Sequence, residues 1–121
     1  MIVGIGNDLI EIERVSHACE KESFLTRIFT TREIALITDD KKRAAGNFAV
    51  KEAVSKMFGT GFRGFRPIEI EVLRDDLGRP YVNLYGEAKN MAKTLGIDQI
   101  HVSISNTKEF ANAVVVGEHL Q

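Results

Sequence analysis

DKKRAAGNFAVKEAVSKMFGTG, residues 40–61, decides the fold because it predicts one long helix. The stretch from Asp40 to Phe58 holds no proline and a single glycine, Gly46. Its small and apolar residues recur at helical spacing and form a stripe of Ala45, Phe48, Ala49, Ala53, Val54, Met57 and Phe58. Gly59 follows where helices often end in a left-handed residue. We therefore expect a long helix that ends at Phe58 and packs against a sheet.

Strands and shorter helices are predicted on both sides of this helix from periodicity and turn residues. Strands are expected over residues 2–10, 68–72, 81–84, 100–105 and 111–116. Strict alternation makes 68–72 a half-exposed strand, and the turn at 75–80 makes it one arm of a hairpin. Short helices are expected over Ile12, Val15 and Cys19, after a capping box formed by Thr30 and Glu33, and over 87–95. The fold class is α+β, an antiparallel sheet packed against one long helix and several short helices.

Length and composition indicate one ordinary domain over residues 1–121. The chain has 44% hydrophobic and 27% charged residues, and its net charge is −1. These values argue against a disordered tail and against a nucleic-acid-binding arm. Cys19 is the single cysteine, so neither an internal disulfide nor a Cys-rich zinc site is expected. The apolar runs are too short to span a membrane, and no basic segment precedes Asp8, so we expect a cytoplasmic protein.

The charge is unevenly distributed along the chain. Residues 41–66 hold seven basic residues and one acidic residue, Glu52, whereas acidic residues are in excess on both sides. Such a block is usually an exposed helix face. It also suits a phosphorylated or acidic partner.

Asp8 is the first candidate for chemistry, because it lies in an otherwise apolar strand. Gly4 and Gly6 share its face and leave room beside the carboxylate. The simpler interpretation is that Asp8 caps the following helix, and on Asp8 alone that interpretation is favoured.

Glu52 and Lys56 lie four residues apart on the long helix and therefore on one side of it. The simpler interpretation is a surface ion pair. The alternative is a site in which Asp8 and Glu52 hold Mg²⁺ while Lys56 neutralises a phosphate, because Mg²⁺ commonly takes one or two carboxylates and substrate phosphate oxygens.

Two further groups of residues are weaker candidates. Gly59-Thr60-Gly61 offers accessible backbone N–H groups, although it also suits a simple helix stop and lacks the spacing of a P-loop. Polar residues follow the strand 100–105, and they would either bind a ligand or cap the turn into Phe110.

Four motifs resemble those of the holo-acyl-carrier-protein synthases, the small 4′-phosphopantetheinyl transferases. The first is GIGNDLIEIER, residues 4–14, and the second is FAVKEAVSK, residues 48–56, followed by Gly-Thr-Gly. Gly78-Arg79-Pro80 and His101-Val102-Ser103-Ile104-Ser105 match two less specific motifs in the same order. The resemblance spans almost the whole chain.

The resemblance implies a reaction and its partners. Coenzyme A would bind with Mg²⁺, a serine of acyl carrier protein would attack the β-phosphate, and adenosine 3′,5′-bisphosphate would leave. The phosphopantetheine arm would move to the serine and so support fatty acid biosynthesis. The enzyme would be a homotrimer with sites between subunits.

The resemblance also implies roles for particular residues. Asp8 and Glu52 would bind the metal ion, Glu52 would help to deprotonate the serine, and Lys56 would contact a phosphate. The residues that would line the coenzyme pocket are Ser55, Gly59, Thr60, Gly61, Pro80, Ser105, Asn106 and Thr107. Arg14 and Arg27 would contact the acidic carrier protein.

Two positions depart from the family pattern. Asn47 stands where the family usually has Arg, and Asn106 stands where it often has His. Both family residues would help to hold the coenzyme, so their loss keeps a second hypothesis open, a binding module for acidic carrier proteins with little or no turnover. Lys41, Lys42 and Arg43 are candidates to compensate. A metal-dependent phosphohydrolase ranks last, because the extra ligands of a two-metal site are missing.

Overall fold

The computed structural model describes residues 1–120 and confirms the α+β class. Its elements are β1 (Ile2–Glu11), α1 (Ile12–Ala18), α2 (Glu22–Ile28), α3 (Thr31–Ile37), α4 (Lys41–Phe58), β2 (Ile70–Arg74), β3 (Pro80–Leu84), α5 (Gly86–Leu95), β4 (Gln99–Asn106) and β5 (Phe110–Glu118). The predicted end of the long helix is confirmed, since Gly59 follows α4 with a φ of 81°. The Thr30–Glu33 capping box at the start of α3 is confirmed as well.

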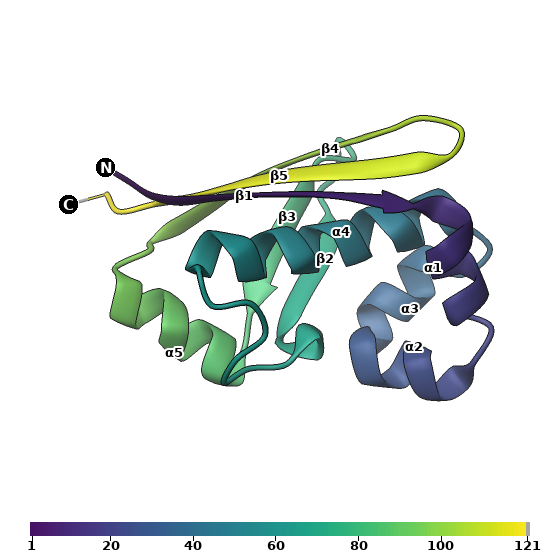
Figure 1. The fold of residues 1–121 in the computed structure, drawn as a ribbon, viewed down its shortest axis with the longest axis horizontal. Coiled ribbons are helices and arrows are strands. Elements are labelled where there is room, and N and C mark those ends of the chain that lie inside the picture. Colours follow the sequence, from purple (N-terminus) through teal and green to yellow (C-terminus); the bar gives the residue numbers. More distant parts are fainter. Residues whose placement is uncertain (121) are drawn as a thin grey trace.

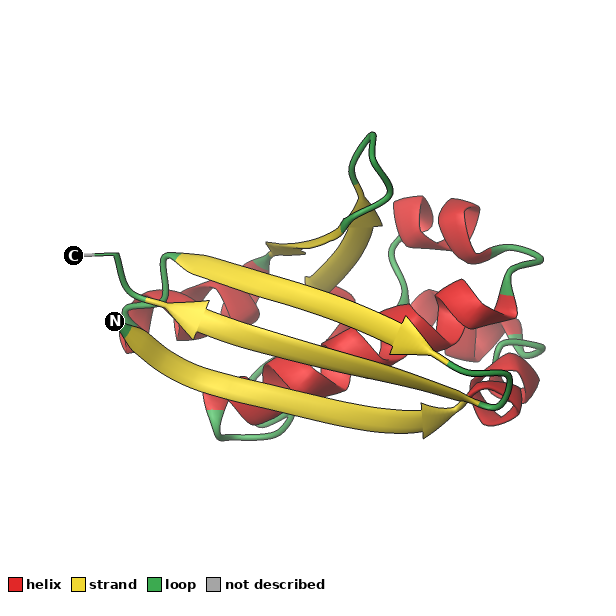
Figure 2. Cartoon of the chain, turned by 90° about the horizontal axis from the view of Figure 1, so that it is seen from above, coloured by secondary structure: helices red, strands yellow, loops and turns green. Residues whose placement is uncertain are grey.

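The strands form two antiparallel sheets, where the sequence suggested one. The larger sheet has the order β1-β5-β4, and β2 pairs with β3 in a separate hairpin. The two short strands splay away from the larger sheet, so no ladder joins β3 to β4 (Figure 2). The hairpin instead packs against the other side of the long helix.

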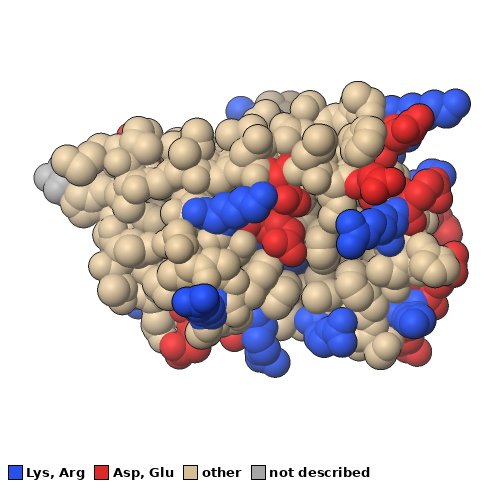
Figure 3. All heavy atoms as spheres, in the orientation of Figure 1, with Lys and Arg blue, Asp and Glu red and all other residues tan. Residues whose placement is uncertain are grey.

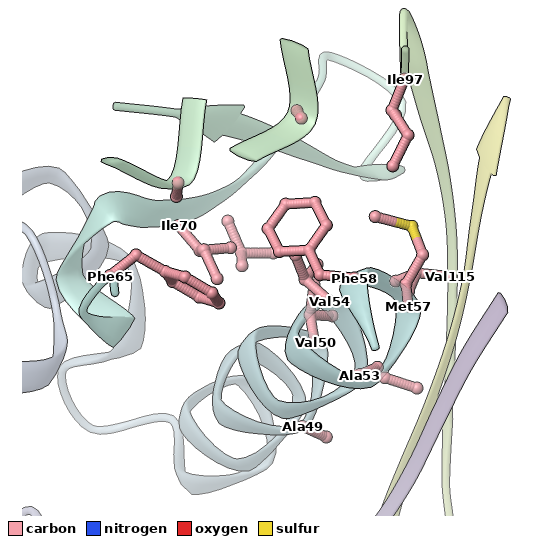
Figure 4. Close-up of a cluster of buried hydrophobic side chains, with 14 residues drawn as sticks. Ala49, Val50, Ala53, Val54, Met57, Phe58, Phe65, Ile70, Ile97 and Val115 are labelled. Atoms are coloured by element: carbon pink, nitrogen blue, oxygen red, sulfur yellow. The ribbon is translucent and has the colours of Figure 1, made fainter. Parts of the chain in front are cut away.

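Helix α4 is the centre of the molecule. It lies between the three-stranded sheet and the β2–β3 hairpin with α5, while α1, α2 and α3 gather around its first turns (Figure 1). Toward the hairpin, Val50 and Val54 pack near Ile70, and toward the sheet Met57 lies beside Val115 (Figure 4). Burial of these side chains on both faces of α4 stabilises the helix in its place.

The backbones of β1 and α4 touch. A Cβ atom added to Gly6 would lie 1.8 Å from the carbonyl oxygen of Ala53, and one added to Gly4 would lie 2.4 Å from that of Met57. The space expected beside Asp8 is therefore filled by the helix and not by a ligand. Only glycine permits this approach, which brings β1 and α4 together at a fixed spacing.

A buried ion pair joins α3 to α4. The Lys51 ammonium donates hydrogen bonds to Glu33 Oε1 at 2.8 Å and to the backbone carbonyls of Pro67 and Ile70. The Asn47 amide donates to Glu33 Oε2 at 3.1 Å. Burial lowers the pKa of Lys51 and raises that of Glu33, and their mutual attraction opposes both shifts.

Strand β2 corrects the expectation of a half-exposed strand over 68–72. The strand begins at Ile70 after a 3₁₀ turn (Pro67–Glu69), and Glu71 is buried. Its carboxylate accepts hydrogen bonds from the Thr30 hydroxyl at 2.6 Å, the Tyr85 hydroxyl at 2.8 Å and the Asn83 amide at 3.1 Å. The alternating pattern of the sequence predicted that the Glu71 carboxylate faces water. In the structure these three donors, all distant in sequence, take the place of water around it.

The outer face of the larger sheet is uncovered within residues 1–120 (Figure 2). Ile5 is 66% exposed and Leu9 is 63% exposed on this face of β1. Exposed apolar side chains along a strand are typical of a surface that another molecule covers. None of the helices in residues 1–120 is long and apolar enough to cross a membrane.

Candidate active site

Asp8 of β1 and Glu52 and Lys56 of α4 meet where the two elements touch. Asp8 lies two residues beyond Gly6, on the face of the strand that meets the helix. The Lys56 ammonium donates to Asp8 Oδ1 at 3.0 Å and to the backbone carbonyl of Asn7 at 3.1 Å. Acidic and basic side chains lie side by side in the middle of the face in Figure 3, over the region where β1 runs beside α4 in Figure 1.

These contacts overturn both simpler interpretations of the residues. The helix that follows β1 begins after Glu11 and receives no side-chain cap, so Asp8 is not its cap. In the described part of the chain Lys56 pairs with Asp8 rather than with Glu52. The three side chains therefore form one cluster from two elements.

The electrostatics of the cluster favour an added cation. Partial burial, together with the negative charge of Asp8, raises the pKa of Glu52, while Lys56 acts in the opposite direction. Two neighbouring carboxylates that share one ammonium keep a net negative charge. A divalent ion between them would reverse that sign.

Asp8 and Glu52 fit Mg²⁺ by their chemistry. Hard carboxylate oxygens are its preferred protein ligands, and one or two carboxylates suffice when substrate phosphates complete the shell. No cluster of three or more metal-ligating side chains occurs in residues 1–120. This donor set therefore suits a metal ion shared with a substrate better than a closed structural site.

A pocket of about 530 Å³ opens beside this cluster. Asp8, Glu52 and Arg14 line it together with apolar side chains, among them Phe24, Phe48 and Phe110. A charged end and an apolar wall within one pocket suit a partner that brings both a reacting polar group and apolar side chains.

A second pocket, of about 350 Å³, contains other predicted residues. Pro80 and Asn106 line it with Gly78, Ile104 and the basic side chains of Lys42, Arg43 and Arg74. Three cations in one concave site suit a phosphate group. Asp40 is the acidic residue on its wall.

Asn47 lies elsewhere than the family comparison led us to expect. It is fully buried, and its amide group donates to Glu33 and to the Val72 carbonyl, so it does not line the second pocket. Arg74, from β2, lies beside the neighbouring Gly46. Arg74 was not predicted from the sequence, because its position between a strand and a turn is typical of an ordinary exposed residue.

The remaining predicted residues are dispersed. Ser55 is buried and donates its hydroxyl to the Glu52 carbonyl, whereas Gly59, Thr60 and Gly61 form the turn after α4. The Thr107 hydroxyl accepts hydrogen bonds from Glu109 and Phe110, which is the turn cap considered above, and Ser105 is exposed on β4. Arg27 is exposed at the end of α2.

The structure thus brings Asp8, Glu52, Lys56 and Arg14 together but places Pro80 and Asn106 in a different pocket. Asn112 of β5 is another residue that the sequence did not indicate. Its amide donates to Asn7 Oδ1 at 2.7 Å and to the Asp8 carbonyl at 2.9 Å, so it holds the segment that carries Asp8. Its role depends on the pairing of the first strand with the last, which no local pattern reveals.

Comparison with known proteins is consistent with this geometry. The model of the 4′-phosphopantetheinyl transferase superfamily matches residues 4–115. A holo-[acyl-carrier-protein] synthase of Lachnoclostridium phytofermentans is 62% identical over 98% of this chain and 97% of that protein. A Clostridium acetobutylicum protein of the same name is 48% identical over 98% of each chain.

Solved structures of proteins with the same name have the same fold as this chain. The holo-[acyl-carrier-protein] synthase of Neisseria meningitidis has a TM-score of 0.88 at 30% identity and covers 98% of this chain and 99% of its own. That of Helicobacter pylori, solved in complex with coenzyme A, has a TM-score of 0.84 at 32% identity and covers 94% of this chain and 99% of its own.

The fold, the family match and these relatives therefore define a transferase of the phosphopantetheinyl class. The chain belongs to the 4′-phosphopantetheinyl transferase superfamily and, within it, to the holo-[acyl-carrier-protein] synthases.

Proposed function

We propose that residues 1–121 act as one domain that transfers the 4′-phosphopantetheine arm of coenzyme A to a serine of apo-acyl carrier protein, with Mg²⁺ at Asp8 and Glu52. The serine oxygen forms a bond to the β-phosphorus, the pyrophosphate bond breaks, and adenosine 3′,5′-bisphosphate leaves. The observation that carries the proposal is the meeting of Asp8, Glu52 and Lys56 at the edge of one pocket. Relatives that bear the synthase name, one of them solved with coenzyme A, support it.

The residues of the cluster divide the work. Mg²⁺, when bound, supplies positive charge to the pyrophosphate oxygens. Lys56 adds a further positive charge to a phosphate, and Glu52 accepts the proton of the serine hydroxyl, directly or through a water molecule. Phosphoryl-type transfer depends mainly on such positioning and charge neutralisation.

The second pocket takes the nucleotide side of the coenzyme. Pro80 and Asn106 line it, and Arg74 with Lys42 and Arg43 supplies the charge that the family places at the positions of Asn47 and Asn106. Ser105, Thr107, Ser55 and the Gly59–Gly61 turn remain assigned to the coenzyme by family resemblance. The charges of Arg74 and its neighbours weaken the case for an inactive binding module.

The carrier protein docks on the side of the first pocket. Arg14 lies at its wall beside the reacting cluster, and Arg27 is exposed on α2. Acidic side chains of the carrier would pair with these arginines, so association should slow as salt is added.

The active form is a homotrimer with its sites between subunits. In one chain the carboxylate cluster and the basic pocket are separate, which supports a site that a neighbouring subunit completes. The uncovered apolar face of the larger sheet gives such neighbours a surface to bury. We place the enzyme in the cytoplasm, where it supplies carrier protein for fatty acid biosynthesis.

Intact-mass spectrometry of apo-carrier protein tests the proposal. The wild-type chain with coenzyme A and Mg²⁺ should add the mass of phosphopantetheine to the carrier. Asp8→Asn should lower the initial rate at least about 100-fold, because one of two metal ligands is lost. Glu87→Gln, an exposed change on α5, is the matched control and should leave the rate unchanged.

Two outcomes would contradict the proposal. Full activity of Asp8→Asn would refute the metal assignment. Carrier binding by the wild type without any mass gain would favour the binding module.

A further inference from the structure

Without a metal ion, the Asp8 carboxylate is paired with the Lys56 ammonium. Lys56 Nζ lies 3.0 Å from Asp8 Oδ1 and 3.1 Å from the carbonyl oxygen of Asn7, so the ammonium is held by two acceptors of one segment of β1. Asn112 fixes that segment from the opposite side through the Asn7 side chain and the Asp8 carbonyl. The ammonium therefore has a defined place and is not merely near the carboxylate.

A divalent ion at Asp8 would approach this ammonium closely. Carboxylate oxygens bind Mg²⁺ at about 2.1 Å, so an ion on the oxygen that Lys56 contacts would lie no more than about 5 Å from its nitrogen. Two cations at that distance repel each other strongly. One of them must leave or the carboxylate must be shared between them at a loss of affinity.

Lys56 can leave this place more easily than Asp8 can, because it is the more exposed of the two side chains. The side chain of Lys56 is 54% exposed and that of Asp8 is 15% exposed. A lysine has four flexible carbons and carries its charge at a single point, so it can leave one anion for another at little cost. Coenzyme A offers that second anion in its pyrophosphate.

We propose that Lys56 and the divalent ion compete for Asp8, so that metal binding transfers the Lys56 ammonium from Asp8 to the coenzyme phosphate. The inference rests on the proposed metal site. Lys56 thereby has two roles, as counter-ion of Asp8 before loading and as phosphate ligand after it. Metal and coenzyme then bind with positive coupling. The metal ion takes Asp8 and releases Lys56 for the coenzyme phosphate, and the coenzyme phosphate in turn draws Lys56 away from Asp8.

Titration calorimetry with Mn²⁺ as the probe tests the competition at about pH 8, well above the range in which carboxyl groups ordinarily titrate. Without coenzyme, Lys56→Met should bind Mn²⁺ about 3- to 10-fold more tightly than the wild type, since the competing cation is gone. The factor by which Mn²⁺ tightens coenzyme A binding should be smaller in Lys56→Met than in the wild type.

Two variants serve as controls. Lys56→Arg keeps the charge and should bind Mn²⁺ within about 2-fold of the wild type. Lys89→Met removes an exposed charge on α5 and should change neither affinity. Mn²⁺ binding to Lys56→Met that is equal to or weaker than that of the wild type overturns the competition. A wild-type chain that takes up no Mn²⁺ even with coenzyme A present overturns the metal assignment of the proposed function instead.

Discussion

Helix α4 carries two lysine–carboxylate pairs that are built in opposite ways. Lys51 and Glu33 are 1% and 0% exposed, and the lysine has three acceptors for its three N–H groups. Lys56 and Asp8 are 54% and 15% exposed, and Glu52 lines the same pocket as Asp8. The two lysines are five residues apart and so point roughly 140° apart around the helix.

The comparison shows how surroundings give the same residue types different uses. A buried pair with every hydrogen bond made holds elements together and has nothing left to offer a ligand. An open pair that keeps carboxylate oxygens free can exchange its partners. Chemistry is therefore expected at Lys56 and stability at Lys51.

The largest effect should come from breaking the buried pair. Lys51→Met should lower the free energy of unfolding by about 3–5 kcal/mol, because Glu33 would be left as an uncompensated buried charge. Lys56→Met should lower it by less than about 1 kcal/mol, as for other exposed pairs. Urea denaturation followed by circular dichroism measures both.

Adding Glu33→Gln to Lys51→Met should restore part of the lost stability, since the orphaned charge disappears. Equal losses in the two lysine variants would refute the contrast between the pairs.

The next effect is the pH dependence of metal binding at the open pair. Burial and the charge of Asp8 raise the pKa of Glu52, so its carboxylate takes up a proton at a higher pH than an ordinary glutamate. Metal ligands must be deprotonated, so Mn²⁺ affinity should fall as pH drops through this raised value, by up to about tenfold per pH unit.

Lys56→Met should move that fall to still higher pH, because Lys56 holds the pKa of Glu52 down. Calorimetry at a series of pH values measures the shift. A fall at the pH of a free glutamate in both proteins would contradict the assignment.

The smallest effect is expected at Glu71, a buried carboxylate without a lysine. Burial tends to raise its pKa, but hydrogen bonds from Thr30, Asn83 and Tyr85, together with the charge of Arg32, outweigh burial and hold the pKa below its usual range. Tyr85→Phe should therefore cost about 1 kcal/mol at neutral pH. This contribution exists above the unfolded-state pKa and is lost as pH falls through the lower folded-state pKa, so the difference between variant and wild type should shrink in acid.

Denaturation curves at neutral and acidic pH check this expectation, with Tyr81→Phe as the matched control, since Tyr81 lies at the other end of β3 and is 38% exposed, against 46% for Tyr85. A difference that grows in acid would contradict it.

Local signals in the sequence were sufficient for much of this fold. The end of α4 at Phe58 and the capping box at Thr30 were predicted correctly, because each depends on neighbouring residues alone. The hairpin of β2 and β3 was predicted for the same reason.

Features that depend on distant partners were not predictable in this way. Glu71 looked exposed because charge normally implies water, and its three donors come from other elements. Three other features likewise arise only when the chain is folded. They are the buried ion pair of Lys51 and Glu33, the division of the strands into two sheets, and the place of Arg74 in the basic pocket.

Direct contact between the backbones of β1 and α4 sets the spacing of Asp8 and Glu52. Near Asp8 and Glu52, the main chains of the two elements are in van der Waals contact at Gly6 and Ala53. No compressible side chain lies between the strand and the helix at this point. Substitutions of apolar residues elsewhere in the interior, accumulated over evolutionary time, would therefore alter the stability of the protein. They would leave the distance between the carboxylates of Asp8 and Glu52 almost unaltered.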